Sequence, residues 1–146
     1  MKKFKINDGG REEAGYKGHT GDCICRSIAI ATGKDYKKVY QGLINTKDSM
    51  RQTKYIKYSH PRTGIYKRIC DTYLKELGWT WIPTMGIGTG CRVHLKPDEL
   101  PTGKLIVRLS KHMTAVINGI INDTYDPSRN GTRCVYGYYI KQQKGR

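Results

Sequence analysis

The chain has 146 residues, enough for one domain with a real core and too few for two independent ones. Its 27 Lys and Arg residues against 12 Asp and Glu give a formal charge of +15, so nucleic acid or an acidic protein is an expected partner. No stretch has the roughly 20 apolar residues of a membrane span, and the basic start lacks the apolar run of a secretory signal. We therefore expect a single domain over residues 1–146, no membrane partner and a cytoplasmic location.

The first half of the chain is predicted to be mainly helical. Residues 1–20 mix Gly, Lys and Glu with little periodicity and are expected to form an extended arm, before a core over residues 21–146. Apolar residues at helical spacing, with capping or glycine signals at the ends, predict three helices: Cys23 to Ala31 with a stop at Gly33, Asp35 to about Leu43, and about Ile65 to Leu77 with Thr63 as cap. Residues 45–61 are expected to form a long polar loop.

The second half is predicted to be rich in strands. The stretch WTWIPT reads as a short strand, the glycines of GIGTG as a turn, and KPDELPTG as a turn or short helix. Four further strands are predicted in KLIVRLS, HMTAVIN, IINDTYD and CVYGYYIK. Helices first and an antiparallel sheet afterwards indicate an α+β architecture.

Five cysteines is an odd number, and in a reducing cytoplasm free thiols are expected rather than a disulfide framework. Cys70 is expected to pack within a helix, and Cys91 and Cys134 to be ordinary strand or turn residues. Cys23 stands where a helix should begin, a position that favours the thiolate form of a cysteine. Cys25, two residues on, is expected to point elsewhere.

The dipeptide Asn118-Gly119 is a strong signal for a two-residue hairpin turn. In the register set by this turn, His112 and Asp123 are diagonal neighbours on one face, close enough for a carboxylate to meet an imidazole. Asp126 falls on the other face, but a proline after it ends the strand, which leaves Asp126 as the second candidate.

A carboxylate bonded to one imidazole nitrogen fixes the tautomer and stabilises the imidazolium, and the other nitrogen is left to exchange a proton with a nucleophile. Cys23 is the candidate nucleophile, since an imidazolium near a helix start activates a thiol. The residues therefore predict a triad of Cys23, His112 and an aspartate, with Asp123 preferred.

An early Cys opening a buried helix, a late His opening a strand and an acidic residue on the next strand resemble compact papain-like cysteine peptidases, including the bacteriocin-processing type. The stretches GDCICRSIAIATGKDYKKVY, YLKELGWTWIPTMGIGTGC, HLKPDELPTGKLIVRLSKHMTAVINGIINDTYDP and GTRCVYGYY look more closely like an uncharacterised family of small proteins from tailed phages and bacteria. This resemblance covers most of the chain from about Gly21 onward.

The resemblance implies a papain-like fold, with N-terminal helices packed on a C-terminal antiparallel sheet. It also implies a cysteine-peptidase-like hydrolase or acyl transferase that cleaves a peptide, isopeptide or amide bond in a protein or peptide substrate. No cofactor is expected. A phage-encoded protein would act in the host cytoplasm, with a place in the virion as the alternative.

One feature of papain-like enzymes is missing from the sequence. They usually carry a glutamine a few residues before the cysteine, as a hydrogen-bond donor to the oxyanion, and no glutamine precedes Cys23. His19, Thr20 or the backbone N–H of Cys23 would have to take this role.

A basic, tyrosine-rich segment supports an alternative function, a nucleic-acid-binding protein on a catalytically inactive papain-like scaffold. No acidic residue occurs between Asp48 and Asp71. The candidate contacts are Arg51, Lys54, Tyr55, Lys57, Tyr58, Arg62, Lys67 and Arg68. The same segment is also compatible with an ordinary solvated surface.

A zinc module is a further alternative, because His19, Cys23 and Cys25 together with Cys91 and His94 could supply four ligands. The Cys-x-Cys spacing is tighter than zinc sites usually have, and no second Cys-x-x-Cys accompanies it. We therefore expect no metal.

Overall fold

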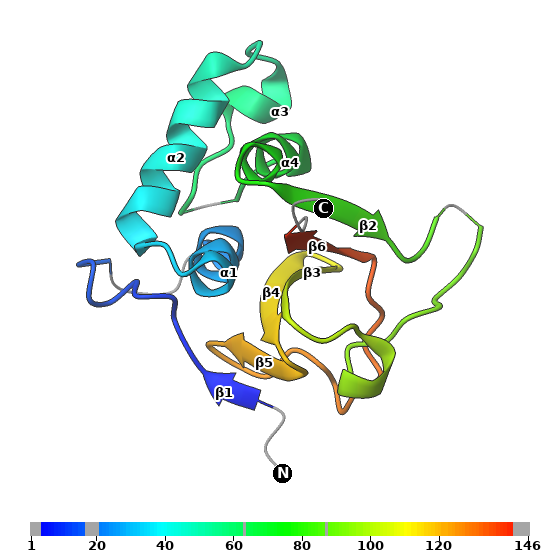
Figure 1. Cartoon of the computed structure of the whole chain (residues 1–146). Coiled ribbons are helices and arrows are strands. Elements are labelled where there is room, and N and C mark those ends of the chain that lie inside the picture. Colours follow the sequence, from blue (N-terminus) through cyan, green and yellow to red (C-terminus); the bar gives the residue numbers. More distant parts are fainter. Residues whose placement is uncertain (1–3, 17–20, 63, 87, 142–146) are drawn as a thin grey trace, which may run out of the picture.

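The computed structural model describes residues 4–16, 21–62, 64–86 and 88–141, in which helices from the first half of the chain pack against a sheet (Figure 1). The helices are α1 (Cys23–Thr32), α2 (Tyr36–Ser49), α3 (Lys54–Lys57), α4 (Lys67–Glu76) and the 3-10 turn η1 (Pro97–Glu99). The strands are β1 (Phe4–Ile6), β2 (Trp79–Pro83), β3 (Lys104–Leu109), β4 (His112–Ile117), β5 (Ile120–Asp123) and β6 (Gly137–Lys141). The predicted α+β class is confirmed.

The sheet has six strands in the order β1-β5-β4-β3-β6-β2. All neighbours are antiparallel except β1, which pairs with β5 in parallel. The prediction of a purely antiparallel sheet is therefore wrong at one edge, where β1 pairs in parallel, whereas β2 at the other edge is the predicted strand in WTWIPT and pairs antiparallel with β6. Residues 4–6, predicted to belong to an extended arm, form β1, and a strand of three residues is too short to give a periodic signal.

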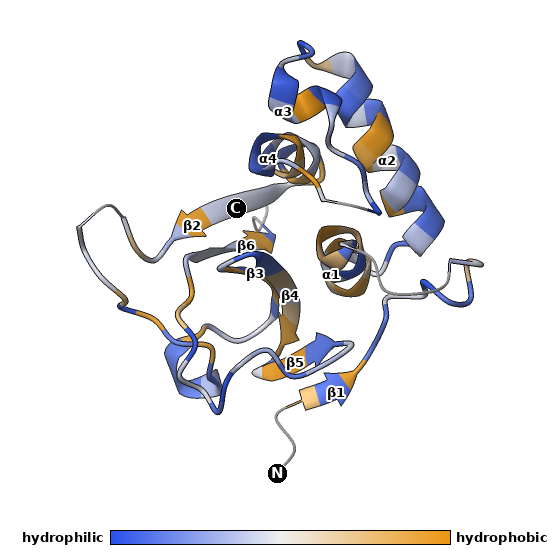
Figure 2. Ribbon diagram, turned by 180° about the vertical axis from the view of Figure 1, so that it is seen from behind, coloured by the Kyte–Doolittle hydropathy of each residue, from blue (hydrophilic) through white to orange (hydrophobic). Residues whose placement is uncertain are grey.

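Each face of the sheet has its own apolar cluster. On one face, α1 packs against β4, β3 and β5, and its buried residues join those of α2 and α4. On the other face, the segment around η1 covers a second cluster that includes Leu95, Leu105, Val107 and Val116. Figure 2 shows α1 as largely hydrophobic and α3 as largely hydrophilic, which fits the central place of α1. Among the described residues, no helix is long and apolar enough to cross a membrane.

Two of the helix predictions need correction. Helix α2 continues to Ser49 and α3 follows, so the predicted polar loop over residues 45–61 is partly helical. The buried stripe of α2 runs through Leu43 and on to Thr46, a polar residue that conceals the helical pattern. Helix α4 begins at Lys67 after Tyr66, whereas the predicted cap, Thr63, lies outside the described residues. Gly33 ends α1 in the left-handed conformation, as predicted.

A disulfide joins Cys91 to Cys134, which lie 43 positions apart in sequence and have their Cα atoms 5.7 Å apart. The prediction that all five cysteines are free is therefore wrong for this pair. An isolated antiparallel β-bridge pairs His94 with Cys134 beside the disulfide. These two residues are far apart in sequence, so no local pattern predicts that they pair. The disulfide ties the segment before η1 to the residues that precede β6. Cys23, Cys25 and Cys70 are free thiols.

Candidate active site

The hairpin of β4 and β5 brings His112 and Asp123 together. Asn118 and Gly119 have φ values of 50° and 81°, the left-handed pair of a tight hairpin turn, and the predicted register holds along the strands. At the open end, His112 Nε2 lies 2.7 Å from Asp123 Oδ2. The two side chains are only 8% and 3% exposed, so solvent does not compete for this bond. The predicted contact between this histidine and aspartate is confirmed.

Cys23 lies at the first position of α1, half-buried, and its side chain is a hydrogen-bonding neighbour of the His112 imidazole. Ser27 fixes this approach, because its Oγ lies 2.6 Å from the carbonyl oxygen of Cys23 and 2.9 Å from that of Met113. The first turn of α1 is thereby held against the start of β4. Because Nε2 of His112 is hydrogen-bonded to Asp123, Nδ1 is the ring nitrogen that can interact with the Cys23 thiol.

The electrostatics of this cluster favour a charged imidazole. Burial disfavours protonation of His112, but the hydrogen bonds and charges of Asp123 and Cys23 outweigh it and raise the pKa of His112 to about 9. Burial also opposes ionisation of Asp123, yet the hydrogen bond and charge of His112 hold the pKa of Asp123 below its ordinary value. At neutral pH the pair is therefore an imidazolium and a carboxylate.

A buried arginine continues the network behind the aspartate. Arg26 Nη1 lies 3.3 Å from Asp123 Oδ1 and 2.7 Å from Thr124 Oγ1, while its Nε lies 3.0 Å from Asp22 Oδ1. Each carboxylate oxygen of Asp123 thus has its own partner, His112 on one and Arg26 on the other. Sequence reasoning missed Arg26, although its spacing of four from Asp22 on a buried helix was a usable signal.

Asp22 receives further partners that hold the start of α1. Arg11 Nη1 lies 3.1 Å from Asp22 Oδ1, and the Tyr36 hydroxyl donates to Asp22 Oδ2 over 2.7 Å. Asp22 is fully buried and makes no side-chain cap to its own helix. Its carboxylate therefore leaves the first N–H groups of α1 uncapped, next to the Cys23 thiol.

Other predicted site residues lie apart from the cluster. Asp126 Oδ1 accepts a hydrogen bond of 2.9 Å from the Ser128 N–H, so it caps a turn instead of contacting the imidazole. Cys25 is fully buried, and burial together with the charge of Asp22 raises the pKa of its thiol to about 12. His19 and Thr20, the expected oxyanion donors, lie outside the described residues.

Tyr125 is a further neighbour of the His112 imidazole. Its ring centroid is 5.2 Å from that of His112, and half of the residue is exposed. It therefore forms an aromatic wall beside the partly accessible end of the cluster.

The predicted nucleic-acid contacts divide into two groups. Arg62 lies over the Tyr16 ring, and Lys67 binds Asp71 at 2.9 Å while covering the Trp81 ring, so both serve the fold. The remaining six are exposed around α3: Arg51, Lys54, Tyr55, Lys57, Tyr58 and Arg68. Tyr55 also stacks on Tyr66, with centroids 5.4 Å apart.

The described ligands of the zinc alternative, which exclude His19, are not brought together. Cys91 is bonded to Cys134, His94 pairs with Glu99, and the Cys25 thiol points to the Tyr36 carbonyl. In the part of the chain that the structure describes, no group of three or more His, Cys, Asp or Glu side chains could hold a metal ion.

Comparison of the chain with protein-family models, curated proteins and solved structures finds no match.

Proposed function

We propose that the protein is a cysteine-peptidase-like hydrolase or acyl transferase, in which Cys23, His112 and Asp123 form a catalytic triad. The observation that carries the proposal is the 2.7 Å bond between His112 and Asp123 beside a half-buried cysteine at a helix start. A structural ion pair would need no thiol, and a structural thiol would be better placed in the core, as Cys25 and Cys70 are.

In this mechanism the Cys23 sulfur attacks the carbonyl carbon of a peptide, isopeptide or amide bond, and a C–S bond forms. Developing negative charge collects on the carbonyl oxygen. His112 then gives its proton to the departing nitrogen as the C–N bond breaks, which leaves an acyl thioester and a free amine. Asp123 keeps the imidazole oriented and stabilises its charged form throughout.

The thioester is resolved by water or by an amine. His112, now neutral, takes a proton from the incoming nucleophile, and the C–S bond breaks to release Cys23. Water yields a carboxylic acid and therefore hydrolysis, whereas an amine yields a new amide and therefore transfer. Burial of the His112–Asp123 pair supports either outcome, because a dry site strengthens the electrostatic stabilisation on which both steps depend.

The oxyanion is assigned to the N–H of Cys23, with His19 and Thr20 kept as the further donors expected from the sequence. The absence of a side-chain cap from Asp22 supports this assignment, since the first N–H groups of α1 are not used by that carboxylate. One donor of this kind typically contributes about 10²–10³ in rate.

Within the α+β class, we propose that the fold is papain-like. Its support is the order of elements, with a helix carrying the cysteine at its start and packed on a sheet whose hairpin carries the histidine and aspartate. Of the two locations that the phage resemblance allows, the Cys91–Cys134 disulfide favours the virion, because disulfides persist at virion surfaces more readily than in a reducing cytoplasm.

A library of peptidyl acyloxymethyl ketones, which alkylate activated cysteines after docking as substrates, tests the proposal. We expect labelling at Cys23 alone, with a preference among peptide sequences, and loss of labelling in His112→Ala. Cys25 and Cys70 are internal controls for unactivated thiols. The proposal is overturned when no member of the library labels Cys23 while free iodoacetamide does.

A nucleic-acid-binding function is the second candidate, favoured by the surface around α3. Tyr55 and Tyr66 form an exposed stacked pair, and Arg51 and Arg68 line the same cavity of about 560 Å³ beside them. Cations next to exposed aromatic rings can follow a phosphate backbone while bases stack. This surface could serve an enzyme or an inactive scaffold equally well.

Fluorescence anisotropy with a labelled single-stranded oligonucleotide tests this candidate. Binding should weaken steeply with added salt, and Arg51→Gln/Arg68→Gln should reduce the salt slope by about 1–2. Lys37→Gln/Lys38→Gln removes the same charge from an exposed part of α2 and should leave the slope unchanged. Equal effects of the two double variants would mean that the net charge of the protein, and not the surface around α3, accounts for the binding.

A further inference from the structure

A groove at the opposite end of α1 from Cys23 is independent of the proposed active site. It has a volume of about 1170 Å³ and lies where α1 ends, β3 begins, and β2 and β6 pair. Helix α1 rises about 1.5 Å per residue, so its ten residues separate Cys23 from Thr32 by roughly 14 Å. A ligand in this groove would not touch the Cys23 thiol.

The floor of the groove is apolar. Leu77 and Trp79 line it on the α1 side of the sheet, and Ile82, Leu105 and Ile140 line it on the other side; Trp79 and Leu105 are buried and the others half-buried. Small-molecule sites combine a mainly apolar lining with a limited number of polar groups that orient the ligand. The floor can therefore cover the hydrocarbon body of a ligand.

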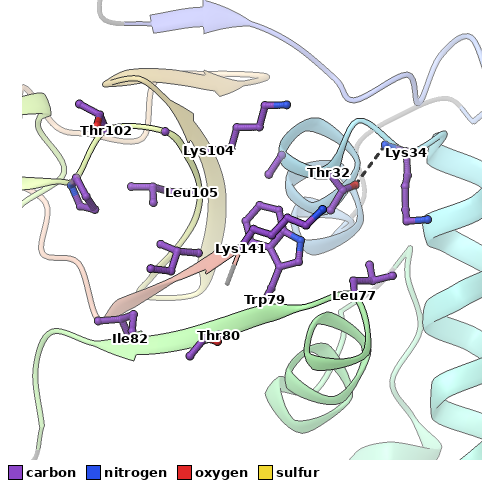
Figure 3. A pocket seen from close by; sticks show the side chains of 14 residues that line it. Thr32, Lys34, Leu77, Trp79, Thr80, Ile82, Thr102, Lys104, Leu105 and Lys141 are labelled. Carbon is purple, nitrogen blue, oxygen red and sulfur yellow. Dashed lines mark hydrogen bonds between the residues drawn. The ribbon is translucent and has the colours of Figure 1, made fainter. Parts of the chain in front are cut away.

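The rim of the groove is cationic. Lys34, Lys104 and Lys141 line it, and no aspartate or glutamate is among its described lining residues. Figure 3 shows Lys104 and Lys141 reaching from neighbouring strands toward the end of α1, where Thr32 lies. Within the described part of the chain, none of the three ammonium groups has an ion-pair partner.

The end of α1 does not cancel this charge. The C-terminal carbonyl groups of a helix carry a partial charge of about −0.5, and the three lysines together carry six times as much positive charge. The groove thus combines an apolar floor with a net positive rim. An organic carboxylate with an apolar body satisfies both features.

We propose that this groove binds a small organic acid, with its aryl or alkyl body on the Trp79 floor and its carboxylate between Lys104 and Lys141. Two ammonium groups on adjacent strands can each donate to one carboxylate oxygen. Lys34 adds to the positive potential from the end of α1. This site does not depend on the proposed reaction at Cys23.

Titration of the ¹⁵N-labelled full chain with 4-phenylbutyrate, followed by two-dimensional ¹H–¹⁵N NMR, tests the proposal. Saturable shifts are expected at the amides of Thr32, Thr80 and Gly103, which line the groove. The neutral analogue 4-phenylbutan-1-ol should bind about tenfold more weakly, as expected for the loss of two exposed ionic contacts.

Variants separate the groove from general attraction to a basic protein. Lys104→Gln/Lys141→Gln should weaken 4-phenylbutyrate binding about tenfold, because both side chains are exposed and can be replaced without loss of the fold. Lys37→Gln/Lys38→Gln should leave it unchanged. The proposal is overturned by absence of saturable shifts at the groove, by equal binding of acid and alcohol, or by equal effects of the two double variants.

Discussion

Removing the charge of Asp123 should lower the pKa of His112. The pKa of His112 is raised from 6.5 to about 9, which corresponds to roughly 3 kcal/mol in favour of the imidazolium. Asp123 provides both a hydrogen bond and a charge to this effect, and Cys23 provides the rest. Asp123→Asn should therefore lower the pKa by at least about 1 unit, or about 1.4 kcal/mol. The neighbouring Asp126→Asn removes a carboxylate that does not contact the imidazole and should leave the pKa unchanged.

The stability of the protein should follow the same titration. Because the folded-state pKa of His112 is raised, its stabilising effect is complete below pH 6.5 and is lost as the pH rises through about 9. The lowered pKa of Asp123 adds stability that is present above its ordinary value of 3.8 and is lost as the pH falls. In Asp123→Asn, the decline in unfolding free energy between pH 6.5 and 9 should shrink or vanish.

NMR of protein labelled with ¹³C at the histidine imidazoles provides the assay, with His112→Ala to assign the resonance. Urea unfolding at several pH values gives the matching stability curve. Titration of His112 at or below 6.5 in the wild-type protein, or an unchanged pKa in Asp123→Asn, would refute the electrostatic reasoning.

The other predictions concern the buried network, the disulfide and one helix contact. Arg26→Gln removes the guanidinium that Asp22 and Asp123 share, while Arg11 and His112 remain beside them, and should lower the unfolding free energy by about 2 kcal/mol in urea titrations; a loss below about 1 kcal/mol would mean that Arg26 is not an effective partner. Replacing Cys91 and Cys134 together by serine opens a loop of 43 positions and should cost about 2–4 kcal/mol under non-reducing conditions, with no difference from wild type once a reductant is added. Gly42→Ala places a methyl group on the buried Tyr73 ring, so an overpacking cost of about 1–3 kcal/mol should exceed the helix-propensity gain of up to about 1 kcal/mol, and a higher melting temperature would contradict this.

The part of the site that the sequence predicts is the part set by short-range rules. Asn118-Gly119 selects a two-residue turn, the turn sets the register, and the register places His112 beside Asp123. Likewise Gly33 marks the end of α1 because only a left-handed residue fits there. In each case neighbouring residues carry the information.

What the sequence does not predict depends on distant segments. Strand β1 is recognisable only from its parallel partner β5, and the disulfide only from the approach of two segments across the second apolar cluster. Arg26 is similar, because its spacing from Asp22 is local but its contact with Asp123 spans 97 positions. Such features depend on contacts between residues that are distant in sequence, so local propensity does not predict them.

The pH dependence of iodoacetamide alkylation at each free cysteine, followed by mass spectrometry in wild type and His112→Ala, tests the central claim most directly. The account predicts that Cys23 is alkylated much faster than the other free cysteines, and that His112→Ala removes this difference. Cys25 and Cys70 should stay slow, because burial raises the pKa of each thiol to about 12. Slow alkylation of Cys23 at acidic pH, unchanged by the mutation, would contradict an activated cysteine and histidine pair.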